Sequence, residues 1–80
     1  MTSDINEWWS ITVFHGERVG PKRWRAVAHV FRRDRPDTPD RVEEEFVGFG
    51  PTMNGADYDA YCQAKRFVLS QGKPSDWEGR

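Results

Sequence analysis

The side chains of this 80-residue chain that could do chemistry are few: two histidines, His15 and His29, and one cysteine, Cys62. Structural zinc takes four protein ligands and catalytic zinc usually three, at recognisable spacings, and these residues supply no such set. Cys62 has no obvious histidine partner and no second cysteine, and the serines lack a nucleophile-elbow motif. We therefore predict no metal site, no cofactor and no enzymatic activity.

Three consecutive glutamates, Glu43 to Glu45, could suggest general acid–base catalysis. Adjacent positions of a strand point to opposite faces, so only Glu43 and Glu45 would share a side. No segment that could form a pocket lies near them. We interpret them as the charges of a solvated edge strand.

Two predicted strands, residues 8–14 and 23–33, are apolar on both faces. One face carries the residues expected to meet a helix: Trp9, Ile11, Val13, Trp24, Ala26, Ala28 and Val30. The other face carries a second apolar and aromatic set among basic neighbours: Trp8, Phe14, Arg25, Val27, His29 and Phe31. An exposed apolar patch on a small protein often marks a binding surface.

The remaining elements follow from turn and capping residues. Residues 1–7 are polar and predict a loose leader, residues 15–22 a longish hairpin loop, and residues 42–49 a third strand. Asn54 is the predicted N-cap of a helix that stops at Gly72, and the tail 73–80 should be irregular. One buried stripe is expected on this helix: Ala60, Tyr61, Ala64, Phe67 and Val68.

These elements predict an α+β fold: a three-stranded antiparallel sheet packed on one C-terminal helix, in the order β-β-β-α. Eighty residues suffice for one small domain, with a folded core over 8–72. A single helix covers one sheet face, which leaves the second aromatic face uncovered. Alternatively, the leader and Trp77 in the tail could cover it.

Charge is balanced overall, at net −1, but is divided along the chain. Residues 15–35 hold seven basic side chains against two acidic ones, and residues 36–59 hold seven acidic against one basic. Bulk charge therefore excludes binding to nucleic acid or an anionic membrane by net charge alone. A lone cysteine and the lack of a long apolar run predict a cytoplasmic protein, in the host cytoplasm if a phage encodes it, with no membrane segment.

The basic second strand could nevertheless contact DNA, since it mixes cations with stacking rings such as Trp24. The candidate contacts are Lys22, Arg23, Arg25, His29, Arg32 and Arg33. Over residues 8–71, the segments 24–27, 49–52 and 56–64 resemble the small DNA-binding domain at the N-terminus of phage tyrosine integrases. That resemblance implies a three-stranded sheet whose basic second strand contacts DNA, although the carboxylates of Glu43 to Glu45 would repel phosphate.

The leading hypothesis is a small non-enzymatic interaction protein of the size common among phage accessory proteins. It would bind a protein partner, or a second copy of itself as a homodimer, through Trp8, Phe14, Arg25, Val27, His29 and Phe31. DNA binding through the basic strand is the alternative. Neither hypothesis involves a small-molecule substrate or a membrane.

Overall fold

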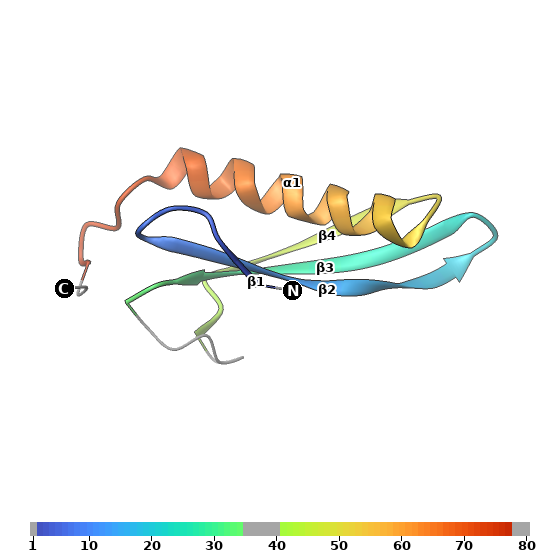
Figure 1. The fold of residues 1–80 in the computed structure, drawn as a ribbon, viewed down its shortest axis with the longest axis horizontal. Helices are drawn as coiled ribbons and strands as arrows, with labels where there is room; N and C mark the ends of the chain where they lie inside the picture. Colours follow the sequence, from blue (N-terminus) through green and yellow to red (C-terminus); the bar gives the residue numbers. More distant parts are fainter. Residues whose placement is uncertain (1, 35–40, 78–80) are drawn as a thin grey trace.

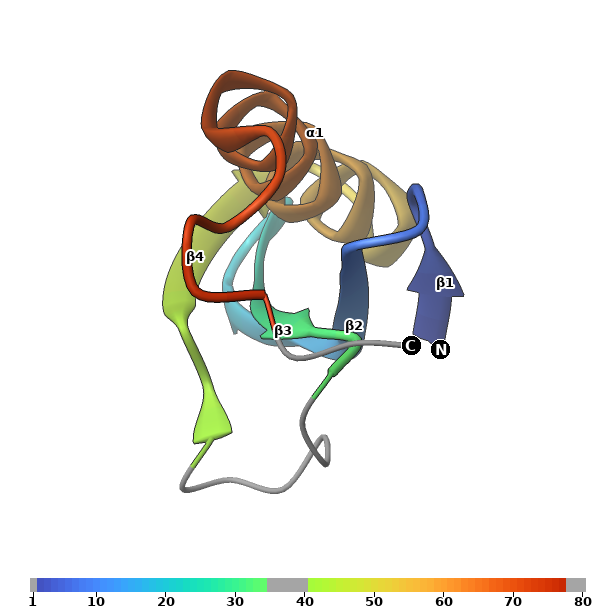
Figure 2. The same cartoon turned by 90° about the vertical axis from the view of Figure 1, so that its left-hand side faces the viewer.

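The computed structural model describes residues 2–34 and 41–77, which form a four-stranded sheet and one α-helix (Figure 1). The elements are β1 (Thr2–Asp4), β2 (Trp9–Gly20), β3 (Arg23–Arg32), β4 (Glu44–Gly50) and α1 (Met53–Gln71). Neighbouring strands are antiparallel in the order β1-β2-β3-β4. Figure 2 shows β1 and β4 at the two edges and α1 over one face. The α+β class and the C-terminal helix are confirmed.

The sheet has four strands rather than three, because part of the predicted loose leader pairs with β2. Thr2 lies opposite Thr12, and their hydroxyls are 2.8 Å apart. The chain reverses at Asn6, whose Oδ1 accepts hydrogen bonds from the backbone nitrogens of Trp8 at 2.9 Å and Trp9 at 3.0 Å. Such a short polar strand carries no apolar periodicity, so only its pairing with β2 reveals it.

Strand β2 continues well beyond the predicted end at Phe14. The register with β3 shifts between Phe14 and Glu17, which indicates a bulge that takes up the extra residue. The hairpin turn is therefore confined to Pro21 and Lys22, instead of a loop over 15–22. The hairpin projects past the end of α1 (Figure 1).

Helix α1 begins two residues earlier than the predicted N-cap, Asn54. Thr52 is the N-cap: its side chain accepts a hydrogen bond from the backbone nitrogen of Gly55 at 3.0 Å. Both residue types are good caps, and Pro51, which fixes its own backbone, favours the earlier start. The predicted stop at Gly72 is confirmed, with φ at 65°.

The core lies between α1 and one face of β2, β3 and β4. Ala56, Ala60, Ala64 and Val68 of the helix are buried, and Tyr61 and Phe67 pack beside them. Facing them are the buried strand residues Trp9, Ile11, Val13, Ala26, Ala28 and Val30, as expected for this face. Small residues at the centre let the helix approach the sheet closely. None of the helical residues that the structure describes forms a segment long and apolar enough to cross a membrane.

Candidate interaction surface

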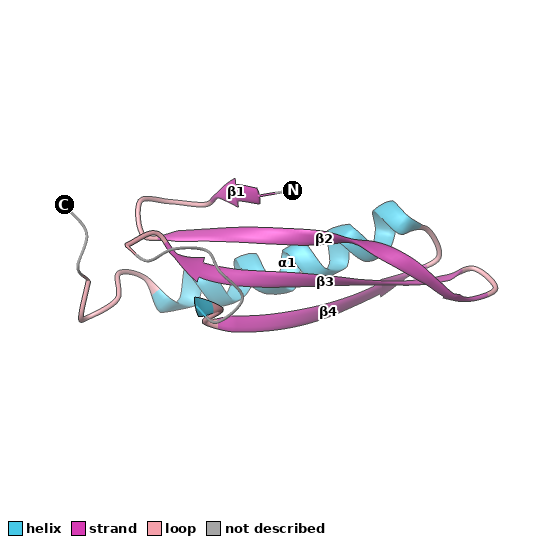
Figure 3. Cartoon of the chain, turned by 90° about the horizontal axis from the view of Figure 1, so that it is seen from below, coloured by secondary structure: helices cyan, strands magenta, loops and turns pink. Residues whose placement is uncertain are grey.

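The sheet face opposite α1 carries a second set of side chains, here called the open face. It is made of Phe14, Arg25, Val27, His29, Glu45, Val47 and Phe49, as the strand register and alternation require. In Figure 3, which looks at this side, β2, β3 and β4 lie in front of α1. None of the helices and strands built from residues 2–34 and 41–77 crosses it.

An apolar row runs across the middle of the open face. Phe14 of β2 lies opposite Val27 of β3, which lies opposite Val47 of β4. Phe14 is 49% exposed and Phe49 is 45% exposed, while the two valines are half-buried. Cross-strand contacts of this kind hold the rings on a rigid surface.

His29 is fixed in place by contacts on both sides. Its ring meets the Phe14 ring edge to face, with centroids 4.9 Å apart. Its Nε2 lies 2.7 Å from Oε2 of Glu45, the residue opposite it on β4. The imidazole therefore links the apolar row to a carboxylate that is 56% exposed.

The two ends of the open face carry opposite charges. Arg25 lies between Glu17 of β2 and Phe49 of β4. The Arg23 guanidinium stands 4.8 Å from the centroid of the Phe49 ring, a cation–π distance. Glu45 lies at the opposite end, on the far side of the Val27–Val47 pair. Arg25 and Glu45 thus bracket the apolar row.

Two predicted members of this surface lie elsewhere. Trp8 precedes β2, where alternation no longer applies, and it packs against the core on the helix side. Phe31 has the expected strand parity but is only 4% exposed, opposite Ser10, which is also buried. Alternation assigns a face and not an exposure, so it could not separate Phe31 from Phe14. Phe14, Arg25, Val27 and His29 come together as predicted.

Val47 and Phe49 belong to the open face although the sequence analysis did not name them. Their positions alternate with Phe46 and Gly48, and that period of two was the available signal. The poor strand propensity of the preceding glutamates obscured it.

The basic residues proposed for DNA are divided between several environments. Lys22 and Arg23 are exposed near the hairpin turn, and Arg25 is half-buried on the open face. His29 is paired with Glu45. Arg33 donates to the backbone oxygen of Asn6 at 2.8 Å. The residues therefore do not form one continuous cationic surface.

Arg32 is buried, 6% exposed, which corrects its proposed place on a DNA surface. Its Nε and Nη2 donate to the two carboxylate oxygens of Asp34 at 3.0 and 2.7 Å, and Nη1 donates to Asp76 at 2.7 Å. The hydrogen bond to Asp34 raises the pKa of Arg32 above its ordinary value. Its even position in β3 directs it to the helix side, where it holds the tail.

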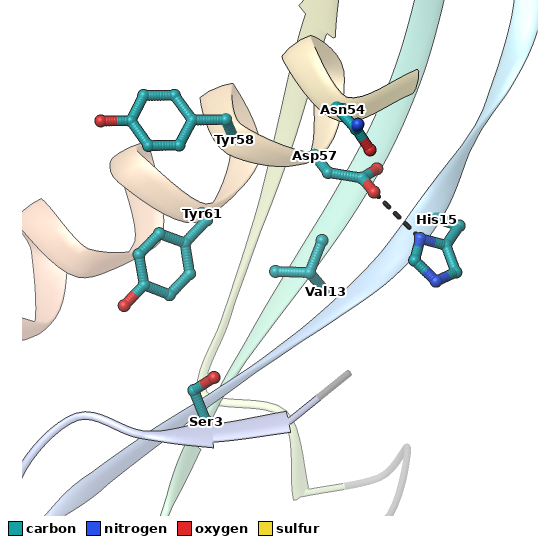
Figure 4. A pocket seen from close by; sticks show the side chains of 7 residues that line it. All are labelled: Ser3, Val13, His15, Asn54, Asp57, Tyr58 and Tyr61. Carbon is teal, nitrogen blue, oxygen red and sulfur yellow. Dashed lines mark hydrogen bonds and ion pairs between the residues drawn. The ribbon is translucent and has the colours of Figure 1, made fainter. Parts of the chain in front are cut away.

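A pocket of about 410 Å³ lies at the other side of the sheet, beneath the start of α1 (Figure 4). Its lining residues are Ser3, Val13, His15, Asn54, Asp57, Tyr58 and Tyr61. Asp57 accepts a hydrogen bond from the backbone nitrogen of Gly16 at 2.9 Å, and its other oxygen lies 2.9 Å from Nδ1 of His15. Both oxygens are thus engaged in holding the β2 bulge to the helix. No group of three or more metal-binding side chains occurs among the described residues.

Comparisons of the chain with protein-family models, with curated proteins and with solved structures returned no match. The resemblance to the integrase domain accordingly stays a prediction, and the geometry of the open face carries the functional argument.

Proposed function

We propose that this protein is a non-enzymatic interaction module that binds a protein through its open face. One observation carries the proposal: two phenylalanines, each about half exposed, flank a pair of valines on a sheet face that no described helix or strand covers. Aromatic residues and arginine are enriched at the centres of protein interfaces, and charged residues are common at their rims. Phe14 and Phe49 supply the rings, while Arg25 and Glu45 supply the rim.

The fixed geometry of these side chains supports the proposal. His29 holds the Phe14 ring from one side, and Arg23 stacks on Phe49. Side chains that are already ordered lose less entropy on binding, so more of the contact energy appears as affinity.

Site-specific photo-crosslinking tests the proposal. A photoreactive phenylalanine analogue at position 14 is compared with the same analogue at Leu69, which is 64% exposed on α1. Both proteins are irradiated purified and in an extract of the organism that encodes the chain. We expect covalent protein adducts, identified by mass spectrometry, from position 14 and not from position 69. Equal adducts from both positions, or none from position 14, would contradict a protein-binding open face.

DNA binding through the hairpin remains the alternative, favoured by the projection of the hairpin beyond α1 with Lys22 and Arg23 exposed. Three phosphate contacts, from Lys22, Arg23 and Arg25, would give a log–log salt slope of about −2.7. Fluorescence anisotropy of a labelled duplex at increasing salt measures that slope. Aromatic burial against a protein depends little on salt, so the two functions are distinguishable.

A further inference from the structure

We propose that the partner of the open face is a second copy of this chain, stacked face to face about a twofold axis that runs across the strands at Val27. This inference rests on the proposed function and names its partner. Two features of the structure support it: a protected sheet edge and the order of charges along the open face.

The outer edge of β4 is protected by side chains. Asp59 of α1 accepts a hydrogen bond from the backbone nitrogen of Phe49 at 3.0 Å, and Gln63 donates to the backbone oxygen of Val47 at 2.8 Å. Farther along the edge, the backbone nitrogen of Glu45 donates to the side chain of Glu44 at 3.2 Å. An edge with its backbone groups occupied is a poor template for adding another strand. Self-association through β4 would therefore use the face and not the edge.

The charges of the open face are ordered along the strands. Arg25 lies level with Phe49, Val27 with Val47, and His29 with Glu45. Successive levels are about 7 Å apart, since they differ by two strand residues. The apolar level is thus in the middle, with a cation at one end and a carboxylate at the other.

A twofold axis across the strands reverses the strand direction of the second copy. It places the apolar level of one sheet on the apolar level of the other, and it brings Arg25 of each copy to the Glu45 end of its mate. Sheets stacked about 10 Å apart allow a long arginine side chain to reach a carboxylate displaced by one strand. Both charge pairs form at once because a twofold interface repeats every contact.

An axis along the strands gives the opposite electrostatic result. It places Arg25 of one copy over Arg25 of the other, and like charges in register oppose association. The charge order therefore selects the antiparallel stack over the parallel one.

A charge-exchange experiment tests the arrangement. Wild-type protein is expected to be a dimer by size-exclusion chromatography with light scattering. Arg25→Glu and Glu45→Arg each place like charges at both symmetric contacts, so each should raise the dimer Kd by about tenfold or more. An equimolar mixture of the two variants restores both attractive contacts, and we expect a heterodimer with affinity close to wild type.

Matched controls change the same charges away from the open face. Arg66→Glu lies on the exposed side of α1, and Glu44→Arg lies on β4 opposite Val30, on the helix side. Both are expected to remain dimeric. Circular dichroism and thermal melting of all variants verify that each one is folded.

The outcomes separate this inference from the proposed function. A wild type that stays monomeric across a concentration series overturns the twofold stack, and adducts from position 14 to a different protein would then leave the protein-binding face intact. A wild-type dimer whose two variants fail to pair in the mixture overturns the stated axis. Absence of any adduct from position 14 removes the proposed function and the stack together.

Discussion

Gly48 of β4 lies directly against the backbone of Ala60 in α1. A Cβ atom on residue 48 would be 2.3 Å from the Ala60 nitrogen and 2.6 Å from the carbonyl oxygen of Ala56. No side chain separates the helix from the strand at this point, so the small residues on both sides set the distance between the two layers. That distance in turn fixes which face of β4 points away from the helix and carries Val47 and Phe49.

Gly48→Ala is expected to destabilise the protein by about 3 kcal/mol, because the added methyl group meets main-chain atoms, which cannot move aside like a flexible side chain. Urea unfolding monitored by tryptophan fluorescence measures the loss. Gly20→Ala is the matched control, since its Cβ would meet only the Arg23 side chain at an ordinary 3.8 Å. Equal stability of the two variants would disprove the close packing of α1 on β4.

Arg32→Ala is expected to lower the free energy of unfolding by about 3 to 5 kcal/mol, because it leaves the Asp34 carboxylate, 1% exposed, without its guanidinium partner. Arg33→Ala should cost less than about 1 kcal/mol, since Arg33 is 39% exposed and its ion pair with Asp4 is at the surface. Thermal melting of both variants provides the comparison. A small effect of Arg32→Ala would show that the charge is not an interior one.

The parts of this fold that the sequence predicts are those with strong local signals. The helix stripe of Ala60, Ala64 and Val68, and the glycine stop at Gly72, depend on spacing and backbone freedom within one element. Strand β3 was predicted to within one residue, over 23–33 against Arg23–Arg32, because both of its faces are apolar. The architecture followed from these elements.

The parts that the sequence misses depend on contacts between distant segments. Strand β1 exists through its pairing with β2, and the bulge before Glu17 is held by Asp57, about forty residues later in the chain. Half of the candidate surface was predictable for the same reason: alternation places Phe14 and Val27 on one face, whereas the burial of Phe31 depends on tertiary packing.

Phe31→Ala is expected to destabilise the fold by about 3 to 5 kcal/mol, because a buried ring leaves a cavity when it is removed. Phe14→Ala on the same face should change stability by less than about 1 kcal/mol, since the ring is half exposed. The effects on association should be the reverse: Phe14→Ala weakens binding at the open face while the protein stays folded. Chemical unfolding and light scattering on both variants test this division, and loss of stability in Phe14→Ala alone would contradict it.

Asp57→Ala is expected to cost about 2 kcal/mol of stability, because it removes a charge-assisted hydrogen bond to the backbone nitrogen of Gly16 in a part-buried place. His15→Ala removes only the other contact of Asp57, and the His15 side chain is 71% exposed, so its cost should stay below about 1 kcal/mol. The comparison separates the two contacts that hold the bulge. Hydrogen exchange of the Gly16 amide is the local measurement: it should accelerate strongly in Asp57→Ala and little in His15→Ala. If both variants accelerate it equally, the ion pair with His15, and not the carboxylate alone, is what fixes the bulge to α1.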